Sequence, residues 1–152
     1  GDPRRRENAA ESSMNVVRPR PATRFDSIRP AGFRILAAID RAAQECRVDL
    51  TITSGTDSHA APDPHTTGEA YDVSVQLLSA QQIADVKASL ERTLGPLFTV
   101  LYEVPTVPSD PTLRPIAYVN ATATGPHFHV QRKKGTEFPP EAVPPLPPPM
   151  VA

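Results

Sequence analysis

The chain has 152 residues, a length that predicts one domain, and its formal net charge is −1. The balanced charge and the 5% aromatic content provide neither a basic surface field nor many stacking platforms, so we expect no nucleic-acid partner. No apolar run approaches the roughly 18 residues that a transmembrane helix needs, so we expect no transmembrane segment. The single cysteine, Cys46, excludes an intrachain disulfide and a zinc site built on cysteine pairs.

Proline is unevenly distributed and divides the chain into parts. It accounts for 19 residues, against a usual share of about 5%, and seven of the 19 lie in residues 139–152. Residues 1–25 are polar, Arg-rich and aperiodic, which is typical of a solvated, mostly disordered arm. We therefore predict a folded domain at 26–138 between a basic arm and a Pro-rich tail. A protein partner could bind either the arm or the tail.

The first half of the folded part predicts a helix and two strands. In residues 30–46, the apolar side chains of Phe33, Leu36, Ile39 and Ala43 recur at helical spacing. Residues 48–54 alternate polar and apolar side chains, and residues 69–76 do so again after a polar loop, so both segments are predicted strands.

The second half predicts one more helix and three more strands. Ser79 and Gln82 form a capping box at the start of helix 79–94, whose buried stripe includes Leu90 and which Gly95 ends. Strands follow at 97–103, 115–121 and 127–132. Strands that succeed one another without helical crossovers favour an α+β fold, with a small antiparallel sheet and the helices packed on one face.

Two short motifs carry ligand-type side chains. The first, HTTGEAYD at 65–72, places His65 at the end of a loop and Asp72 on the adjoining strand. The second, HFH at 127–129, places His127 and His129 on one face of a strand because side chains alternate. A catalytic zinc ion takes three protein ligands of these types and leaves one position to water. The two motifs together predict a zinc site.

The motif HTTGEAYD resembles the His-x-x-Gly-x-Ala-x-Asp motif of the D-alanyl-D-alanine carboxypeptidase/dipeptidase zinc peptidases. Their fold is shared with the Hedgehog N-terminal signalling domain and with phage L-alanyl-D-glutamate endolysins. The order of elements is also similar: a helix, a strand running into TSG, a loop, the motif, a helix, a strand ending in Glu, and then His-x-His. The resemblance covers about residues 30–132 and implies a Hedgehog/DD-peptidase-like fold that binds Zn²⁺.

The resemblance implies zinc ligands but leaves two alternatives for the third. His65 and Asp72 are the first two ligands. In the carboxypeptidase and Hedgehog pattern the third is His129, and His127 lies beside the metal as a group that stabilises the oxyanion. The endolysin branch has a Pro-His-Phe sequence like residues 126–128, which would make His127 the ligand. We prefer His129 because the His-x-His pairing fits the first pattern.

The general base departs from the family pattern, because members of that family carry an acidic residue just before His-x-His, where this chain has Ala123 and Thr124. We hypothesise that residues 104–126 are an insertion, largely an extra hairpin, and that Glu103 keeps the place of the base. Glu69 is an alternative carboxylate, but alternation places it on the strand face opposite Asp72.

The resemblance implies a zinc metallopeptidase that hydrolyses peptidoglycan stem or cross-link peptides, as a carboxypeptidase or an endopeptidase. Such a substrate implies an extracytoplasmic, cell-wall or phage-particle location. Many relatives carry an Arg soon after Ser-Gly that pairs with a substrate carboxylate, whereas Asp57 follows here. Asp57 and His59 either orient a ligand or form a polar turn. The alternative function is a weakly active or inactive zinc-binding structural or interaction domain of a larger assembly.

Overall fold

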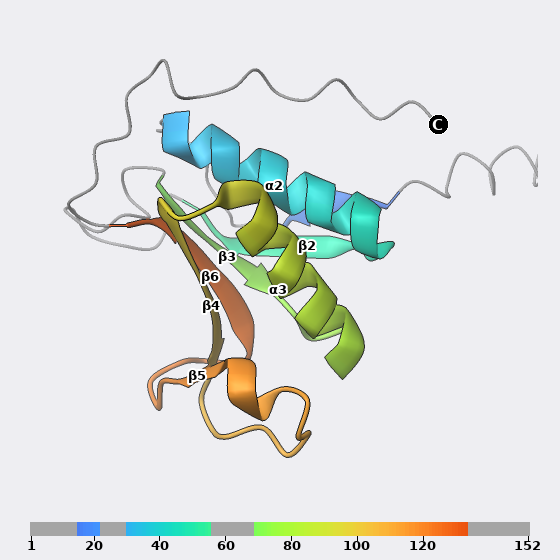
Figure 1. Ribbon diagram of the computed structural model, residues 1–152, viewed down its shortest axis with the longest axis vertical. Coiled ribbons are helices and arrows are strands. Elements are labelled where there is room, and N and C mark those ends of the chain that lie inside the picture. Colours follow the sequence, from blue (N-terminus) through green and yellow to red (C-terminus); the bar gives the residue numbers. More distant parts are fainter. Residues whose placement is uncertain (1–14, 22–29, 56–68, 134–152) are drawn as a thin grey trace, which may run out of the picture.

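The computed structural model describes residues 15–21, 30–55 and 69–133. Two α-helices, six β-strands and one short 3₁₀ helix, η1, form within these residues (Figure 1). In chain order they are β1 (Val17–Pro19), α2 (Pro30–Cys46), β2 (Leu50–Ser54), β3 (Ala70–Ser74), α3 (Ala80–Leu94), β4 (Phe98–Val104), η1 (Arg114–Ile116), β5 (Ala117–Val119) and β6 (His127–Arg132).

The six strands form one mixed sheet in the order β1-β2-β3-β6-β4-β5. The four central strands, β2, β3, β6 and β4, pair antiparallel with one another. At the edges, β1 runs parallel to β2, and β5 runs parallel to β4. The fold class α+β is confirmed, and the expectation of a purely antiparallel sheet is wrong at both edges. The edge strands are parallel to their neighbours because the chain crosses back between them. The segment with α2 does this between β1 and β2, and the long connection at 105–116 does it between β4 and β5.

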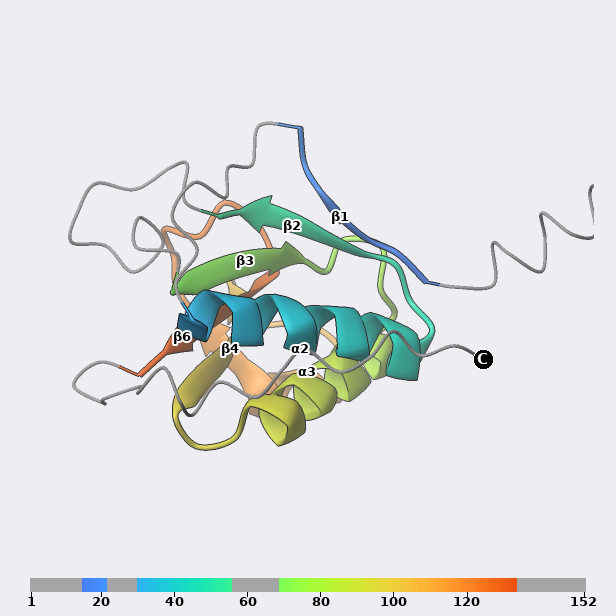
Figure 2. The ribbon, with the colours of Figure 1, turned by 90° about the horizontal axis from the view of Figure 1, so that it is seen from above.

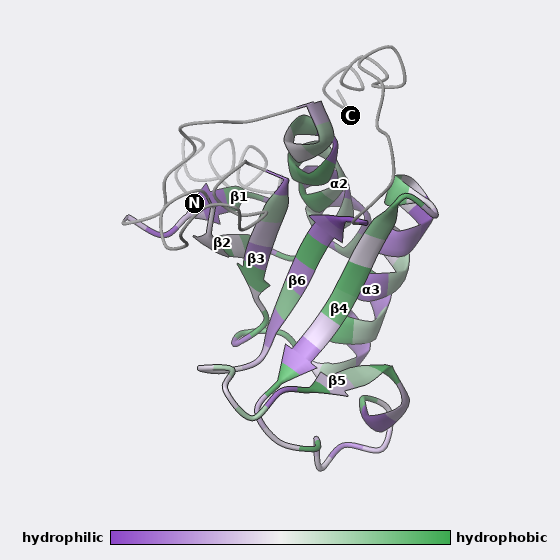
Figure 3. Cartoon of the chain, turned by 90° about the vertical axis from the view of Figure 1, so that its left-hand side faces the viewer, coloured by the Kyte–Doolittle hydropathy of each residue, from purple (hydrophilic) through white to green (hydrophobic). Residues whose placement is uncertain are grey.

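Both helices cover the same face of the sheet, as predicted (Figures 2 and 3). Both helices and the sheet contribute side chains to the core between them. Those that are 0% exposed include Ile35, Ile39, Val86, Leu90, Tyr71, Val73, Phe128 and Val130. Among the described residues, no helix covers the opposite face of the sheet (Figure 3). No helix in the described part of the chain is long and apolar enough to cross a bilayer.

The helix bounds agree with the sequence patterns, but one residue of the predicted buried stripe of α2 is exposed. The α3 capping box is present, because Gln82 N–H donates to Ser79 Oγ and Ser79 N–H donates to Gln82 Oε1. Gly95 ends α3 at a φ of 73°, which favours glycine. In α2, however, Phe33 is 47% exposed, whereas Ile35 is buried. The other residues of the predicted stripe face the core, because Ile39 and Ala43 are 0% exposed and Leu36 packs against the buried cluster, so the prediction is wrong at Phe33.

Two segments differ from the expectation at the edges of the sheet. Val17–Pro19, within the predicted disordered arm, forms β1 and pairs with Leu50–Ile52 of β2. Residues 104–126 do not form the expected hairpin, because β5 pairs in parallel with β4 and Asn120 N–H donates to Val104 O. Both strands have only three residues, and their pairing depends on an edge that no local pattern reveals.

The two helices are joined by a polar contact around Glu45. Its carboxylate accepts from Arg41 Nε on α2 at 2.8 Å and from Ser89 Oγ and Arg92 Nη2 on α3, each at 2.8 Å. Ser89 is 1% exposed, so its hydroxyl needs an acceptor inside the protein. Arg41, Ser89 and Arg92 hold the pKa of the Glu45 carboxyl below its ordinary value of 4.5, against the opposing effect of burial.

We expect Glu45→Gln to lower the free energy of unfolding by about 1 kcal/mol at neutral pH. Because the folded-state pKa is lowered, this contribution is present above pH 4.5 and is lost as the pH falls through the folded-state pKa. Urea denaturation at a series of pH values measures it. Glu91→Gln, which removes the carboxylate of an exposed pair with Lys87 on α3, is the matched control. A constant difference between wild type and Glu45→Gln from neutral to strongly acidic pH would contradict the assignment.

Candidate functional site

The uncovered face of the sheet carries ionisable side chains on β3, β6 and β4. Tyr71 and Val73 of β3 and Phe128 and Val130 of β6 are 0% exposed in the core. Because side chains alternate, their neighbours along these strands point to the other face. On that face β3 presents Asp72 and Ser74, β6 presents His127, His129 and Gln131, and β4 presents Glu103.

The strand register brings four of these side chains together. His129 lies opposite Asp72 across the β3–β6 pair, and His127 lies opposite Glu103 across the β4–β6 pair. His129 Nδ1 is 2.9 Å from Asp72 Oδ1, and His127 Nε2 is 3.2 Å from Glu103 Oε1. Each histidine of β6 therefore contacts a carboxylate from a different neighbouring strand.

His129 has a polar partner at each ring nitrogen. Its Nε2 is 2.8 Å from Gln131 Oε1, in addition to the contact between Nδ1 and Asp72. Burial by itself lowers the pKa of the imidazole, but the hydrogen bonds with Asp72 and Gln131 and the charges of Asp72 and Glu103 outweigh it and raise the pKa above 6.5. The influence of Glu103 on His129 indicates that the two His–carboxylate pairs form one electrostatic cluster.

His127 joins the two pairs. Its Nδ1 is 2.9 Å from Gly125 O, and because a carbonyl only accepts, Nδ1 carries a proton. Its Nε2 faces Glu103 Oε1 at 3.2 Å and Asp72 Oδ1 at 3.9 Å. The same imidazole nitrogen therefore faces both carboxylates of the cluster. A proton on Nε2 would hydrogen-bond to Glu103 in this arrangement.

The structure brings together four of the five predicted site residues, namely Asp72, His127, His129 and Glu103. His65, the remaining predicted zinc ligand, lies outside the described residues, as do Asp57 and His59. Within 15–21, 30–55 and 69–133, no group of three or more His, Cys, Asp or Glu side chains is arranged to hold a metal ion. The described residues therefore provide an incomplete donor set, in which Asp72 and His129 are the closest pair.

Asp72 Oδ1 and His129 Nδ1 are 2.9 Å apart, which is a hydrogen-bond distance. Two ligand atoms on one tetrahedral zinc ion, each at about 2.0–2.1 Å from it, lie about 3.3 Å apart. Coordination of one ion by both side chains would therefore require Nδ1 to lose its proton and the two atoms to move apart by a few tenths of an ångström. The other ring nitrogen of His129, Nε2, would then donate its proton to Gln131 Oε1. A metal-binding histidine usually donates its second N–H to an oxygen acceptor of this kind.

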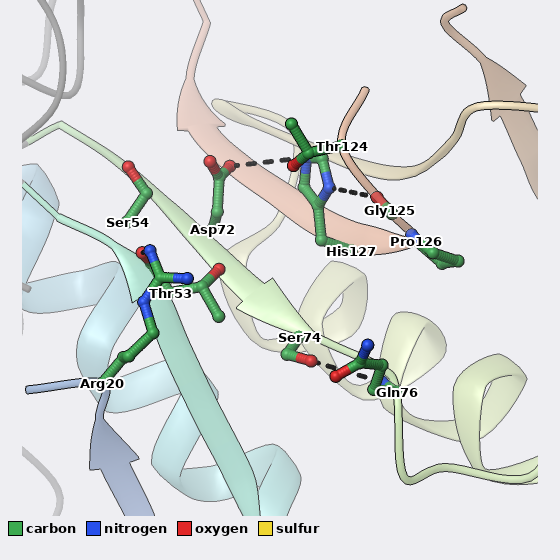
Figure 4. Close-up of a pocket in the computed structure, with 10 residues that line it drawn as sticks. All are labelled: Arg20, Thr53, Ser54, Asp72, Ser74, Gln76, Thr124, Gly125, Pro126 and His127. Carbon is green, nitrogen blue, oxygen red and sulfur yellow. Dashed lines mark hydrogen bonds and ion pairs between the residues drawn. The ribbon is translucent and has the colours of Figure 1, made fainter. Parts of the chain in front are cut away.

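An open pocket of about 480 Å³ adjoins this cluster (Figure 4). Its walls come from three parts of the chain, and most of the residues that line it have polar side chains. Asp72, Ser74 and Gln76 line it from β3 and the following turn, and residues 124–127 line it from the start of β6. The third wall is formed by Thr53 and Ser54 of β2 together with Arg20, which follows β1. A polar ligand could therefore lie across β2 and β3 and reach His127.

Sequence patterns alone missed three residues of this region. Gln131 could have been found, because the alternation that pairs His127 with His129 also places Gln131 on their face. Gly125 contributes a backbone carbonyl, which no side-chain pattern reveals. Arg20 lies in the segment expected to be disordered and reaches the pocket only because β1 adds to the sheet edge.

Comparisons of the chain with models of known protein families, with curated proteins and with solved structures find no significant match. The chemistry of the site is therefore the evidence for its function.

Glu69, the alternative carboxylate of the first motif, contacts Arg132 instead of the cluster. Its Oε2 accepts from Arg132 Nε at 2.5 Å, and Arg132 N–H donates to Glu69 O. The two side chains are only 16% and 25% exposed, so solvent screens the ion pair less than at a fully exposed position. This contact joins the start of β3 to the end of β6 and gives Glu69 a structural role.

We expect Glu69→Gln and Arg132→Gln each to destabilise the fold, with a coupling energy of about 1 kcal/mol in a double-mutant cycle. The physical reason is that each variant removes the same ion pair, so the second substitution costs less than the first. Urea denaturation of the four proteins measures the coupling. A coupling energy near zero would contradict the structural role of Glu69.

Proposed function

We propose that this chain is a zinc metallopeptidase-like domain with the Hedgehog/DD-peptidase fold, acting on peptidoglycan stem or cross-link peptides. The observation that carries the proposal is the pairing of both histidines of β6 with carboxylates, Asp72 on one side and Glu103 on the other. Hydrolysis of an amide needs an electrophilic metal site and a carboxylate base close together, and this arrangement offers residues for both.

In this proposal His65, Asp72 and His129 hold the zinc ion. His129 is favoured over His127 as the third ligand, because its Nδ1 is 2.9 Å from Asp72 Oδ1 whereas His127 Nε2 is 3.9 Å away. His127 also has its Nδ1 engaged with Gly125 O and its Nε2 directed at Glu103. When bound, zinc polarises the peptide carbonyl and lowers the pKa of the attacking water.

Glu103 and His127 provide the acid–base chemistry. Glu103 accepts the proton of the water that adds to the peptide carbonyl carbon, and passes it to the nitrogen of the leaving amine. The C–N bond then breaks and yields a carboxylate and an amine. His127 Nε2 lies beside Glu103 and, when it carries a proton, would donate a hydrogen bond to the oxygen on which negative charge develops. Its contact with Gly125 O orients the ring for this role.

The substrate implies where the chain acts. Peptidoglycan peptides occur outside the cytoplasm, so the cell wall or a phage particle is the proposed location. The Arg-rich arm at 1–25 and the Pro-rich tail at 139–152 are the proposed attachment points for a protein partner.

A second candidate is a structural or interaction domain without turnover. It is favoured by the completeness of the contacts among the described residues, since His129 already pairs with Asp72 and Gln131, and His127 with Glu103 and Gly125. Such a cluster can also stabilise the face of a sheet without binding a substrate.

We expect the zinc-supplemented chain to release amino acids or peptides from purified muropeptides, and Glu103→Gln to reduce the rate by about 100-fold or more, because the amide cannot accept the proton of water. Mass spectrometry of the digested muropeptides measures the products. A metal chelator should abolish the reaction, and added zinc should restore it. Glu69→Gln is the matched control, because Glu69 is a carboxylate close in sequence to Asp72 that does not contact the cluster.

Equal inactivity of wild type and Glu103→Gln, with zinc bound to both, would contradict the peptidase and support the second candidate. Equal activity of the two proteins would contradict the role of Glu103 alone.

A further inference from the structure

An exposed aromatic side chain lies on the uncovered face of the sheet, one strand beyond Glu103. Tyr118 of β5 pairs with Glu103 of β4, and paired residues of neighbouring strands point to the same face. Tyr118 is 52% exposed, whereas Ala117 beside it packs against the core. The other two tyrosines of the chain, Tyr71 and Tyr102, are 0% and 4% exposed. Of the three tyrosines, Tyr118 is therefore the one whose ring a ligand can reach.

A carboxamide next to Tyr118 is held in a fixed orientation. Asn120 N–H donates to Val104 O at 2.8 Å and so continues the β4–β5 pairing, and alternation then places its side chain on the face of Tyr118. Asn120 Oδ1 accepts from the backbone N–H of Thr122 at 3.1 Å and from its Oγ1 at 2.7 Å. Asn120 Nδ2 makes no hydrogen bond to another described residue. The amide therefore presents a pre-oriented donor beside the aromatic ring.

The hydroxyl of Thr122 supplies an acceptor at the same place. Because Oγ1 donates its proton to Asn120, its lone pairs can accept from a ligand. Tyr118 and Asn120 are alternate residues, so their Cα atoms lie about 6.8 Å apart in an extended strand. Leu101 of β4, two residues before Glu103, adds an aliphatic side chain on the same face. We name Leu101, Tyr118, Asn120 and Thr122 the β5 platform.

The chemistry of the β5 platform suits a sugar ring. The C–H face of a pyranose packs on an aromatic ring, while its polar groups need both donors and acceptors at the edge of that ring. A protein partner normally buries about 800 Å² on each side, far more than two apolar side chains provide. Of the described side chains that β3, β6, β4 and β5 point to this face, none is Lys or Arg, so the phosphate of a nucleotide would lack a cationic partner.

We propose that the β5 platform is a sugar-binding subsite, in which Tyr118 stacks on an N-acetylated amino sugar of the peptidoglycan glycan strand. Asn120 Nδ2 donates to the acetamido oxygen, and Thr122 Oγ1 accepts from a ring hydroxyl. The identity of the sugar rests on the proposed function, to which the subsite adds recognition of the glycan. The subsite also gives a function to residues 104–126, the proposed insertion.

The strand order places this subsite relative to the cluster and the pocket. Neighbouring strands lie about 4.8 Å apart, so a sugar on Tyr118 lies directly beside Glu103. The pocket lies on the other side of the cluster, over β2 and β3. A ligand that fills both therefore crosses the strands over His127 and Glu103.

The test uses chitotetraose, a soluble oligomer of N-acetylglucosamine without a peptide, and the full-length chain. Binding is followed by the chemical shifts of the β4 backbone amides and, in the wild type, of the Tyr118 ring and the Asn120 side-chain amide. We expect saturable binding at millimolar concentration. Tyr118→Ala should weaken it about 10-fold or more, and Asn120→Ala about 5-fold. Tyr118→Phe should retain binding, because the aromatic ring remains.

Val119→Ala is the matched control, because Val119 is the next residue of β5, is 49% exposed and points to the other face by alternation. This variant should bind chitotetraose as the wild type does. Unchanged amide chemical shifts of β6 in each variant would show that the fold is kept.

Absence of saturable binding at millimolar concentration, or equal binding by wild type and Tyr118→Ala, would overturn the inference. The two proposals fail separately. Binding of chitotetraose by a chain that never hydrolyses muropeptides would contradict the peptidase and leave the sugar subsite. Hydrolysis of muropeptides by a chain that does not bind chitotetraose would contradict the subsite alone.

Discussion

The insertion of β6 between β3 and β4 determines which side chains meet on the uncovered face of the sheet. β6 places His129 opposite Asp72 and His127 opposite Glu103. The same strand contributes Phe128 and Val130, both 0% exposed, to the core. A shift of one residue in the register would turn the histidines toward the helices and these apolar side chains toward solvent. Core packing therefore fixes the geometry of the site.

The cluster places ionisable groups where the fold alone does not require them. Asp72, Glu103, His127 and His129 have side chains that are only 17–20% exposed. Burying charged groups is unfavourable unless they are paired, and here each histidine contacts a carboxylate. Apolar residues at these positions would avoid the desolvation of four ionisable groups. A cluster of this kind beside a polar pocket is typical of a functional site.

The sequence predicted the parts of the fold that depend on local patterns. Helical spacing, the Ser79 capping box and Gly95 located α2 and α3, and period-two alternation located the central strands and their two faces. The edge strands were missed or misassigned, because three residues such as Val17–Pro19 become a strand only when a neighbouring edge is available. The direction of β5 likewise depends on the path of residues 105–116, which no residue pattern encodes.

The candidate site was predictable to a similar extent. Alternation placed His127 and His129 on one strand face and Asp72 on the face opposite Tyr71 and Val73. The expectation that Glu103 lies close to them came from the resemblance to the zinc peptidases. The partners that orient these side chains were not predictable: Gly125 acts through its backbone, and Arg20 arrives from a distant part of the chain. His65 lies outside the described residues, so its position as a ligand stays a prediction.

The central proposal is that Asp72 and His129 share a metal ion, and the most direct test is anomalous diffraction at the zinc absorption edge. The experiment uses crystals of the full chain grown with zinc. We predict one strong anomalous peak about 2.0–2.2 Å from both Asp72 Oδ1 and His129 Nδ1, with His65 completing the protein ligands. The absence of a peak between Asp72 and His129, or a peak coordinated by His127 without His129, would contradict the account.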